Sequence, residues 1–139
     1  MKSFDLVYVI EDDRITAKIT ELHLYQHGSF GRVQRYDNGR PALDALLRAE
    51  GHVGALPDLI LLDLNMPVMD GWEFLDAFSA HTWHKGVCVC VLTSSIHPGD
   101  MEKAKSYPDV KGYFSKPVDT ILLNQVAQLS DCADHQRAQ

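Results

Sequence analysis

The chain has 139 residues, 45% of them hydrophobic, and its 13 basic and 19 acidic residues give a net charge of −6. This length fits one domain with a real core, and the negative balance argues against a nucleic-acid-binding surface. No apolar run approaches the roughly 20 residues of a membrane span, and the N-terminus lacks the apolar segment of a signal peptide, so we expect a cytoplasmic protein that does not bind membranes.

The first half of the chain predicts two strands, each followed by a helix. Residues 6–10 form an apolar strand, and residues 33–36 form a shorter, more polar one that suits a sheet edge. Gly28 is expected to end the first helix, and Pro41 lies in the first turn of the second. The apolar spacing predicts the residues that these two helices bury: Ile15, Ile19 and Leu22 in the first, and Leu43, Leu46 and Leu47 in the second.

The next strand is the clearest element in the sequence. Residues 59–62 are all apolar and stop at Asp63, as expected for a strand that is buried on both faces of a parallel sheet. Asp70 and Glu73 have the spacing of a capping box. They therefore predict the start of a helix, which would bury Phe74, Leu75 and Phe78.

The last part of the chain continues the alternation. Residues 87–92 predict a buried strand ending at Thr93, residues 98–106 a weakly apolar helix, and residues 112–114 a short strand before Lys116. Cys88 and Cys90 would point to one face of their strand, and all three cysteines are expected to be reduced. The apolar residues of the final helix are Ile121, Leu122, Val126 and Leu129.

Strands that alternate with helices predict βαβ units and an α/β fold with a parallel sheet covered on both faces. Polar residues then gather at the carboxyl ends of the strands, where open α/β sheets bind ligands. Three carboxylates so close together repel one another, and a hard divalent cation such as Mg²⁺ would remove the conflict. An aspartate, a metal, a cation and a hydroxyl donor suit phosphoryl transfer onto a carboxylate. The polar residues expected at this edge of the sheet are Glu11, Asp12, Asp63, Thr93 and Lys116.

Four segments resemble, in order, the motifs of the receiver domains of two-component response regulators. They are Val-Ile-Glu-Asp-Asp at 9–13, Leu-Asp-Leu-Asn-Met-Pro-Val-Met-Asp-Gly at 62–71, Leu-Thr-Ser at 92–94 and Gly-Tyr-Phe-Ser-Lys-Pro at 112–117. The resemblance implies a flavodoxin-like (βα)5 sandwich with strand order 2-1-3-4-5. It covers about residues 5–130 of a single receiver domain, with 131–139 as a short C-terminal tail.

The resemblance also implies the metal site and the phosphoacceptor. Asp63 would accept the phosphoryl group. Mg²⁺ would be bound by Asp12, Asp63 and the backbone carbonyl of Asn65, and by Glu11 through water. Three consecutive acids leave the register open, and the family pattern selects the first two. Asp13 would then cap the first helix.

The remaining roles follow from the same resemblance. Thr93, Ser94 and Lys116 would contact the phosphoryl oxygens, Tyr113 would be the switch residue that responds to Thr93, and a cis peptide would precede Pro117. The donor would be a histidine kinase or a histidine phosphotransfer protein. The short tail leaves no output domain, so the protein would signal by binding a target through the fourth helix, fifth strand and fifth helix, or as a homodimer formed on phosphorylation.

Two other classes of function share some of these features. A haloacid-dehalogenase-type phosphatase also uses an aspartate and Mg²⁺, but it needs a second aspartate where this chain has Asn65. A flavodoxin-like cofactor module needs a phosphate-binding loop after the first strand, where residues 11–13 would repel a phosphate. We therefore expect a phosphorylation-controlled switch rather than an enzyme with its own substrate.

Overall fold

The computed structural model of the protein describes residues 4–52, 54–83, 85–94 and 97–129. Within them, strands and helices alternate strictly, as the sequence predicts. The strands are β1 (Phe4–Ile10), β2 (Phe30–Tyr36), β3 (Leu59–Asp63), β4 (Cys88–Thr93) and β5 (Val110–Ser115). The helices are α1 (Arg14–His27), α2 (Gly39–Ala49), α3 (Gly71–Ser79), α4 (Pro98–Lys105) and α5 (Thr120–Ala127).

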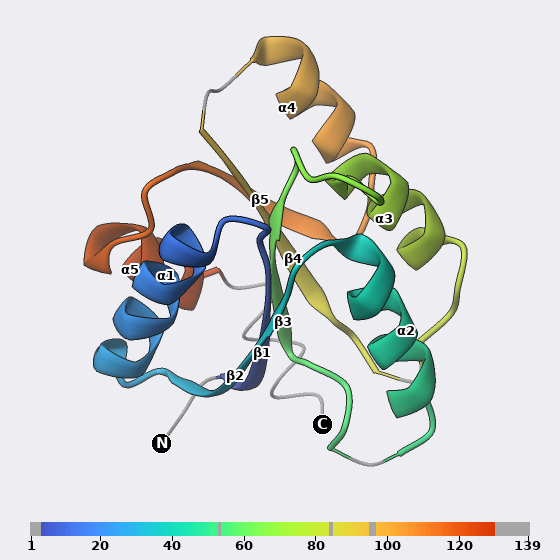
Figure 1. The fold of residues 1–139 in the computed structure, drawn as a ribbon, viewed down its shortest axis with the longest axis horizontal. Coiled ribbons are helices and arrows are strands. Elements are labelled where there is room, and N and C mark those ends of the chain that lie inside the picture. The colour runs from blue at the N-terminus through green and yellow to red at the C-terminus, as the bar shows by residue number, and fades with distance from the viewer. Residues whose placement is uncertain (1–3, 53, 84, 95–96, 130–139) are drawn as a thin grey trace.

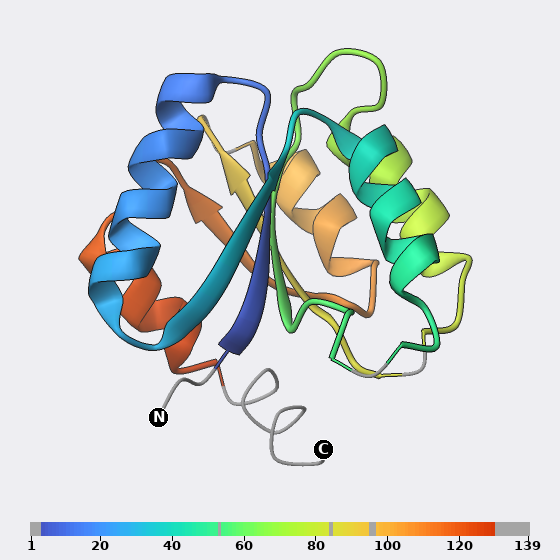
Figure 2. The same cartoon turned by 60° about the horizontal axis from the view of Figure 1, so that its bottom comes forward.

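The strands form one parallel sheet in the order β2-β1-β3-β4-β5, which confirms the predicted flavodoxin-like topology. Helices cover both faces of the sheet: α1 and α5 lie on one side, and α2, α3 and α4 on the other (Figure 1). The strands run in the same direction, so their carboxyl ends meet at one edge (Figure 2). β3 is buried along its whole length, as expected for the middle of such a sheet.

Each face of the sheet has its own apolar core. On the α2 and α3 side, Phe74 and Phe78 stack with ring centroids 5.8 Å apart and are fully buried. On the α1 and α5 side, Phe4 stacks on Phe30 at 5.3 Å. The predicted burial of α3 is thus confirmed, and β1 and β2 begin earlier than predicted because these two phenylalanines pair across the strands.

The predicted buried stripe of α1 is wrong. Ile15, Ile19 and Leu22 are 73%, 45% and 53% exposed, whereas Ala17, Thr20 and Leu24 face the sheet. Small side chains let a helix approach a sheet closely. The hydroxyl of Thr20 can be buried because it donates to the carbonyl of Thr16 at 3.0 Å. The large apolar residues of α1 therefore remain on its outer surface.

Further details concern two other helices and the cysteines. Leu47 is predicted to face the core but is 46% exposed, while α2 buries Leu43 and Leu46. Of the apolar residues of α5, Leu122, Leu123 and Val126 are buried and Ile121 is 70% exposed. Cys90 is a free, buried thiol as expected. Cys88, however, is disulfide-bonded, so the prediction of a reduced thiol is wrong there. Cys132 lies outside the described residues.

The amino edge of the sheet is held by a buried carboxylate. Asp58, which precedes β3, accepts hydrogen bonds from the backbone N–H groups of Asp5 at 2.6 Å and Leu6 at 3.2 Å. Its other oxygen pairs with the ammonium group of Lys85, which precedes β4. This cluster ties the starts of three neighbouring strands together, at the opposite edge from the polar residues predicted to form the site. Among the described residues, no helix is long and apolar enough to cross a membrane.

Candidate phosphoacceptor site

The predicted site residues lie at the carboxyl edge of the sheet because each one ends or follows a strand. Glu11 follows β1, Asp63 is the last residue of β3, and Thr93 is the last residue of β4. Lys116 follows β5, and its backbone N–H donates to the carbonyl of Thr93 at 2.8 Å. The parallel register, in which Thr93 lies opposite Ser115, thus brings residues from distant parts of the sequence to one place.

One lysine joins two of the acids. The Nζ atom of Lys116 lies 2.5 Å from Oε1 of Glu11 and 3.3 Å from Oδ1 of Asp63. Both carboxylates are buried, whereas Asp12 is exposed at the opening of the site. The peptide bond between Lys116 and Pro117 is cis, the isomer that the family resemblance implies.

The electrostatics of the cluster are unbalanced because two buried acids share one lysine. Burial raises the pKa of Glu11 to about 7. The negative charge of Asp63 adds to this effect, and the hydrogen bond from Lys116 opposes it. Burial alone would lower the pKa of Lys116, but its contacts with Glu11 and Asp63 raise it above its usual value. The lysine therefore stays charged while the acids compete for it.

The donor set suits a hard divalent cation. Carboxylate oxygens of Glu11, Asp12 and Asp63 all lie within 4.8 Å of one another. Mg²⁺ prefers oxygen ligands and keeps several waters, which the exposed side of Asp12 would accommodate. Bound there, the cation would supply positive charge that balances the acids and polarises a phosphoryl oxygen. The residues that are present therefore fit the metal that the resemblance implies.

Asp13 lies outside this acidic cluster and caps α1. Its carboxylate accepts hydrogen bonds from the backbone N–H of Ile15 at 3.0 Å and from the hydroxyl of Thr16 at 2.9 Å. The hydrogen bond from Thr16, followed by that from Ile15, holds the pKa of Asp13 below its usual value. The structure therefore places Asp13 where the family register requires it, as a helix cap after the acidic pair.

The loop after Asp63 is tightly built. The backbone N–H of Gly71 donates to the carbonyl of Leu64 at 2.9 Å, and a Cβ atom at Gly71 would come within 2.7 Å of the carbonyl oxygen of Asp63. Val68 has a φ of 73°, in the left-handed region that a β-branched residue rarely adopts. The predicted capping box is confirmed, since Asp70 and Glu73 each accept from the other's backbone N–H.

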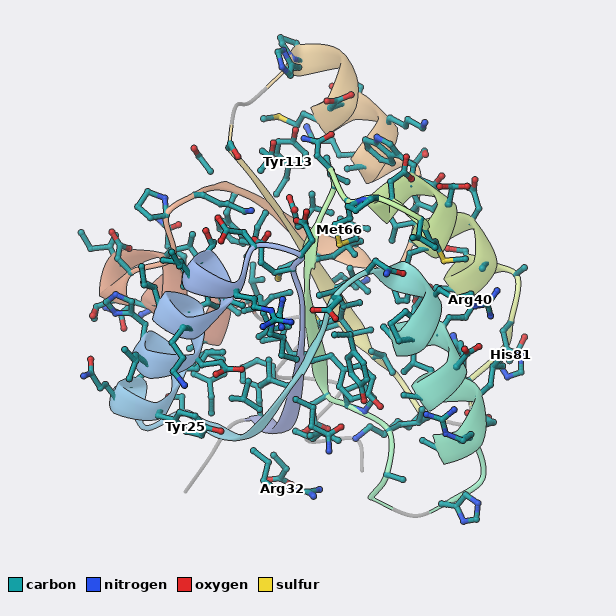
Figure 3. All side chains as sticks on the ribbon, viewed as in Figure 1. Tyr25, Arg32, Arg40, Met66, His81 and Tyr113 are labelled. Carbon is teal, nitrogen blue, oxygen red and sulfur yellow. The ribbon has the colours of Figure 1, made fainter. Side chains whose placement is uncertain are left out.

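The residues predicted to contact the phosphoryl group or to respond to it lie in different parts of the domain. Ser94 and Lys116 line a cavity of about 310 Å³ that also reaches Thr16 and Ile19 of α1. Tyr113 lines a different cavity, of about 240 Å³, with Met101 of α4. Figure 3 labels Tyr113 below α4. Thr93 is buried at the end of β4. The structure therefore places Tyr113 on the α4 side rather than in the acidic cluster.

Arg35, which no sequence pattern singled out, also reaches the site. Its Nη2 atom donates to the backbone carbonyls of Glu11 at 3.0 Å and Asp12 at 3.2 Å. Arg35 lies on β2 opposite Val9 of β1. A basic residue one position before the end of a strand that neighbours β1 was the available signal, but using it required the register of the two strands.

The matching family model is the response regulator receiver domain, over residues 7–128, and the chain belongs to this family. It is therefore a receiver domain of two-component signalling rather than a dehalogenase-type phosphatase or a flavodoxin-like cofactor module. This result agrees with the strand order and with the acidic cluster.

Individual relatives support the same family. The chain is 32% identical over 113 residues to the probable methanogenesis regulatory protein FilR2 of Methanothrix harundinacea, covering 81% of this chain and 72% of that protein. A two-component response regulator from Cytophaga hutchinsonii superposes with a TM-score of 0.83 at 28% identity, with both chains fully covered. The phosphorylated cyanobacterial phytochrome response regulator RcpA superposes with a TM-score of 0.72 at 28% identity, over 89% of each chain. The chain also matches a hybrid signal transduction histidine kinase from Dictyostelium discoideum, but it covers only 5% of that protein's length.

Proposed function

We propose that this receiver domain is a switch that accepts a phosphoryl group on Asp63 from a phosphohistidine of a kinase or phosphotransfer protein. The oxygen of Asp63 would attack phosphorus, the bond from phosphorus to the histidine nitrogen would break, and the imidazole would leave. Mg²⁺ held by Asp12, Asp63 and the carbonyl of Asn65, with Glu11 through water, would balance the charge of the transferred group.

The observation that carries this proposal is the convergence of Lys116 on two buried acids, 2.5 Å from Glu11 and 3.3 Å from Asp63. An ammonium group at this position can also contact a phosphoryl oxygen attached to Asp63, because it already lies close to that carboxylate. Thr93 and Ser94, at the end of β4 and just beyond it, would donate hydrogen bonds from their hydroxyl groups to the remaining oxygens.

The outer face of α1 supports a protein as the phosphoryl donor. Ile15, Ile19 and Leu22 form an exposed apolar row, with Tyr25 one turn further along the helix. Ile19 also lines the cavity that contains Lys116. Apolar side chains that continue from a reactive site onto an open helix face are typical of an interaction surface. The donor would therefore bind across α1 and present its phosphohistidine at Asp63.

The response would be read on another side of the domain. α4 buries only Ala104 fully, and a cavity beside Tyr113 lies between α4 and β5. A helix with so few buried residues shifts at low cost when the site changes. We propose that Thr93 and Tyr113 couple phosphorylation to α4, and that the surface of α4, β5 and α5 binds the downstream protein or a second phosphorylated copy.

Labelling with a small phosphodonor tests the phosphoacceptor directly. The wild-type protein should take up phosphate from acetyl phosphate in the presence of Mg²⁺, and intact mass should rise by a single phosphoryl group. Asp63→Asn keeps the shape of the side chain but removes the nucleophile, so labelling should vanish. Asp13→Asn is the matched control, because Asp13 caps α1, and it should still be labelled. Label that persists on Asp63→Asn would overturn the proposal.

A further inference from the structure

Arg35 connects an edge strand of the sheet to the loop that carries the acidic pair. Its Nη2 atom lies 3.0 Å from the carbonyl oxygen of Glu11, 3.2 Å from that of Asp12 and 2.8 Å from Oδ1 of Asp37. The side chain is 23% exposed. One nitrogen therefore contacts two backbone carbonyls of the site and one surface carboxylate.

The rest of the guanidinium shows which contacts fix its position. The Nε atom of Arg35 is buried and has no hydrogen-bond partner among the described residues. Asp37, in contrast, has a side chain that is 64% exposed, and an ion pair with such a group contributes little. A guanidinium that served Asp37 alone could stay in solvent and keep Nε hydrated. The two carbonyls are therefore the contacts that account for its placement.

The contacted carbonyls belong to the segment between two fixed points. On one side, the backbone N–H of Glu11 donates to the carbonyl of Tyr36 at 3.0 Å, which extends the pairing of β1 and β2. On the other side, Asp13 begins α1 as its cap. Arg35 holds the peptide groups between these points, and the orientation of those groups sets the direction of the Glu11 and Asp12 side chains.

We propose that Arg35 is a positioning residue for the metal-binding acids: it holds the carbonyls of Glu11 and Asp12 so that their carboxylates converge with Asp63. This role rests on the proposed function, since those acids are the proposed ligands of Mg²⁺. Arg35 itself would touch neither the metal nor the phosphoryl group. It acts by restricting the backbone that bears the ligands, as partners of metal ligands commonly do.

Three variants separate this role from a simple surface ion pair. Arg35→Met provides an unbranched, apolar side chain of similar length that donates no hydrogen bond. Arg35→Lys restores a cation whose three donors all lie on a single nitrogen, just as the contacts of Arg35 with Glu11, Asp12 and Asp37 all involve Nη2. Asp37→Asn removes the ion pair and leaves both carbonyl contacts intact.

The first measurement is amide hydrogen exchange of the full chain without metal. The backbone amides of Glu11 and Asp13 donate to the Tyr36 carbonyl and to the Glu11 side chain, within the segment that Arg35 holds. Both amides should therefore exchange about tenfold faster in Arg35→Met. Exchange of Ile60 in β3 should be unchanged, which excludes global destabilisation. Arg35→Lys should regain much of the protection, and Asp37→Asn should match the wild type.

The second measurement is Mg²⁺ affinity by titration calorimetry. Affinity should fall about tenfold in Arg35→Met, less in Arg35→Lys and within twofold of the wild type in Asp37→Asn. Unchanged exchange at Glu11 and Asp13 in Arg35→Met, or an equal loss in Asp37→Asn, would overturn the proposal. If the wild type itself neither binds Mg²⁺ nor takes up phosphate, the proposed function fails, while the exchange data still decide whether Arg35 holds the loop.

Discussion

Two lysine–carboxylate clusters, at opposite edges of the same sheet, use the same groups with opposite results. At the amino edge, Asp58 has Lys85 and two backbone N–H groups as partners. Burial alone would raise the pKa of Asp58, but the hydrogen bonds from Lys85, Leu6 and Asp5 outweigh it and hold the pKa below its usual value. Every charge in this cluster is balanced.

At the carboxyl edge, Glu11 and Asp63 share Lys116, and burial raises the pKa of Glu11 to about 7. The difference agrees with the proposal that the amino edge serves the fold and the carboxyl edge serves phosphoryl transfer. A balanced buried pair stabilises one arrangement, whereas two acids with one lysine leave room for a further positive charge or for a change of charge at Asp63.

The largest difference between the two edges should appear in folding stability. Asp58→Ala leaves Lys85 without its partner and two N–H groups of β1 unbonded, so the free energy of unfolding should fall by about 3 kcal/mol or more. Asp63→Ala should change it far less, because it removes one of two competing acids. Urea denaturation of both variants without metal measures the effect. Equal losses would contradict the comparison.

A smaller effect is expected when Mg²⁺ is added. A ligand that binds only the folded protein stabilises it by about 1.4 kcal/mol at ten times its Kd. This gain should appear in the wild type and in a conservative Asp58→Asn variant, but not in Asp12→Ala, which lacks a proposed ligand. Thermal unfolding with and without Mg²⁺ measures it. A gain that survives in Asp12→Ala would place the binding elsewhere.

A third difference concerns pH, and its sign should differ between the edges. The pKa of Asp58 is lowered on folding, so its contribution is present at neutral pH and is lost as the pH falls below about 4, through the folded pKa. The pKa of Glu11 is raised from 4.5 to about 7, so its contribution is present below pH 4.5 and is lost as the pH rises toward 7.

Urea unfolding without metal, between pH 4.5 and 7.5, isolates the Glu11 contribution. The wild type should lose up to about 3 kcal/mol of stability over this range relative to Glu11→Gln, whose profile should be flatter. Asp58 is ionised throughout the range, so it adds no slope. Parallel profiles in the two proteins would show that Glu11 titrates normally.

The sequence predicted the strands and the positions of the candidate site residues for a common physical reason. A short apolar run such as residues 59–62 suits a strand that is buried on both faces of a parallel sheet, and the residue after it then lies at the carboxyl edge. The rule predicts the position at the carboxyl edge of three residues without knowledge of any contact: Asp63, Thr93 and Lys116.

The buried face of a helix is harder to predict than a buried strand, because apolar periodicity identifies that face only when the alternative face is clearly polar. In α1, Ile15, Ile19 and Leu22 compete with a second stripe of Ala17, Thr20 and Leu24, and the size of the side chains favours the first stripe. The stripe with the smaller side chains can pack against the sheet because the buried hydroxyl of Thr20 donates a hydrogen bond within the helix. Arg35 was missed for another reason: its role depends on the register of two parallel strands, which no local pattern encodes.

The left-handed backbone at Val68 has an evolutionary consequence. A β-branched residue at a φ of 73° is strained by about 1–3 kcal/mol, and Val68 is 81% exposed, so packing returns little of that energy. Neutral drift at this position should therefore favour Gly and Asn over Ile and Thr, since the first two adopt the left-handed region at low cost. A saturation library at residue 68, selected only for folded protein, should show the same bias.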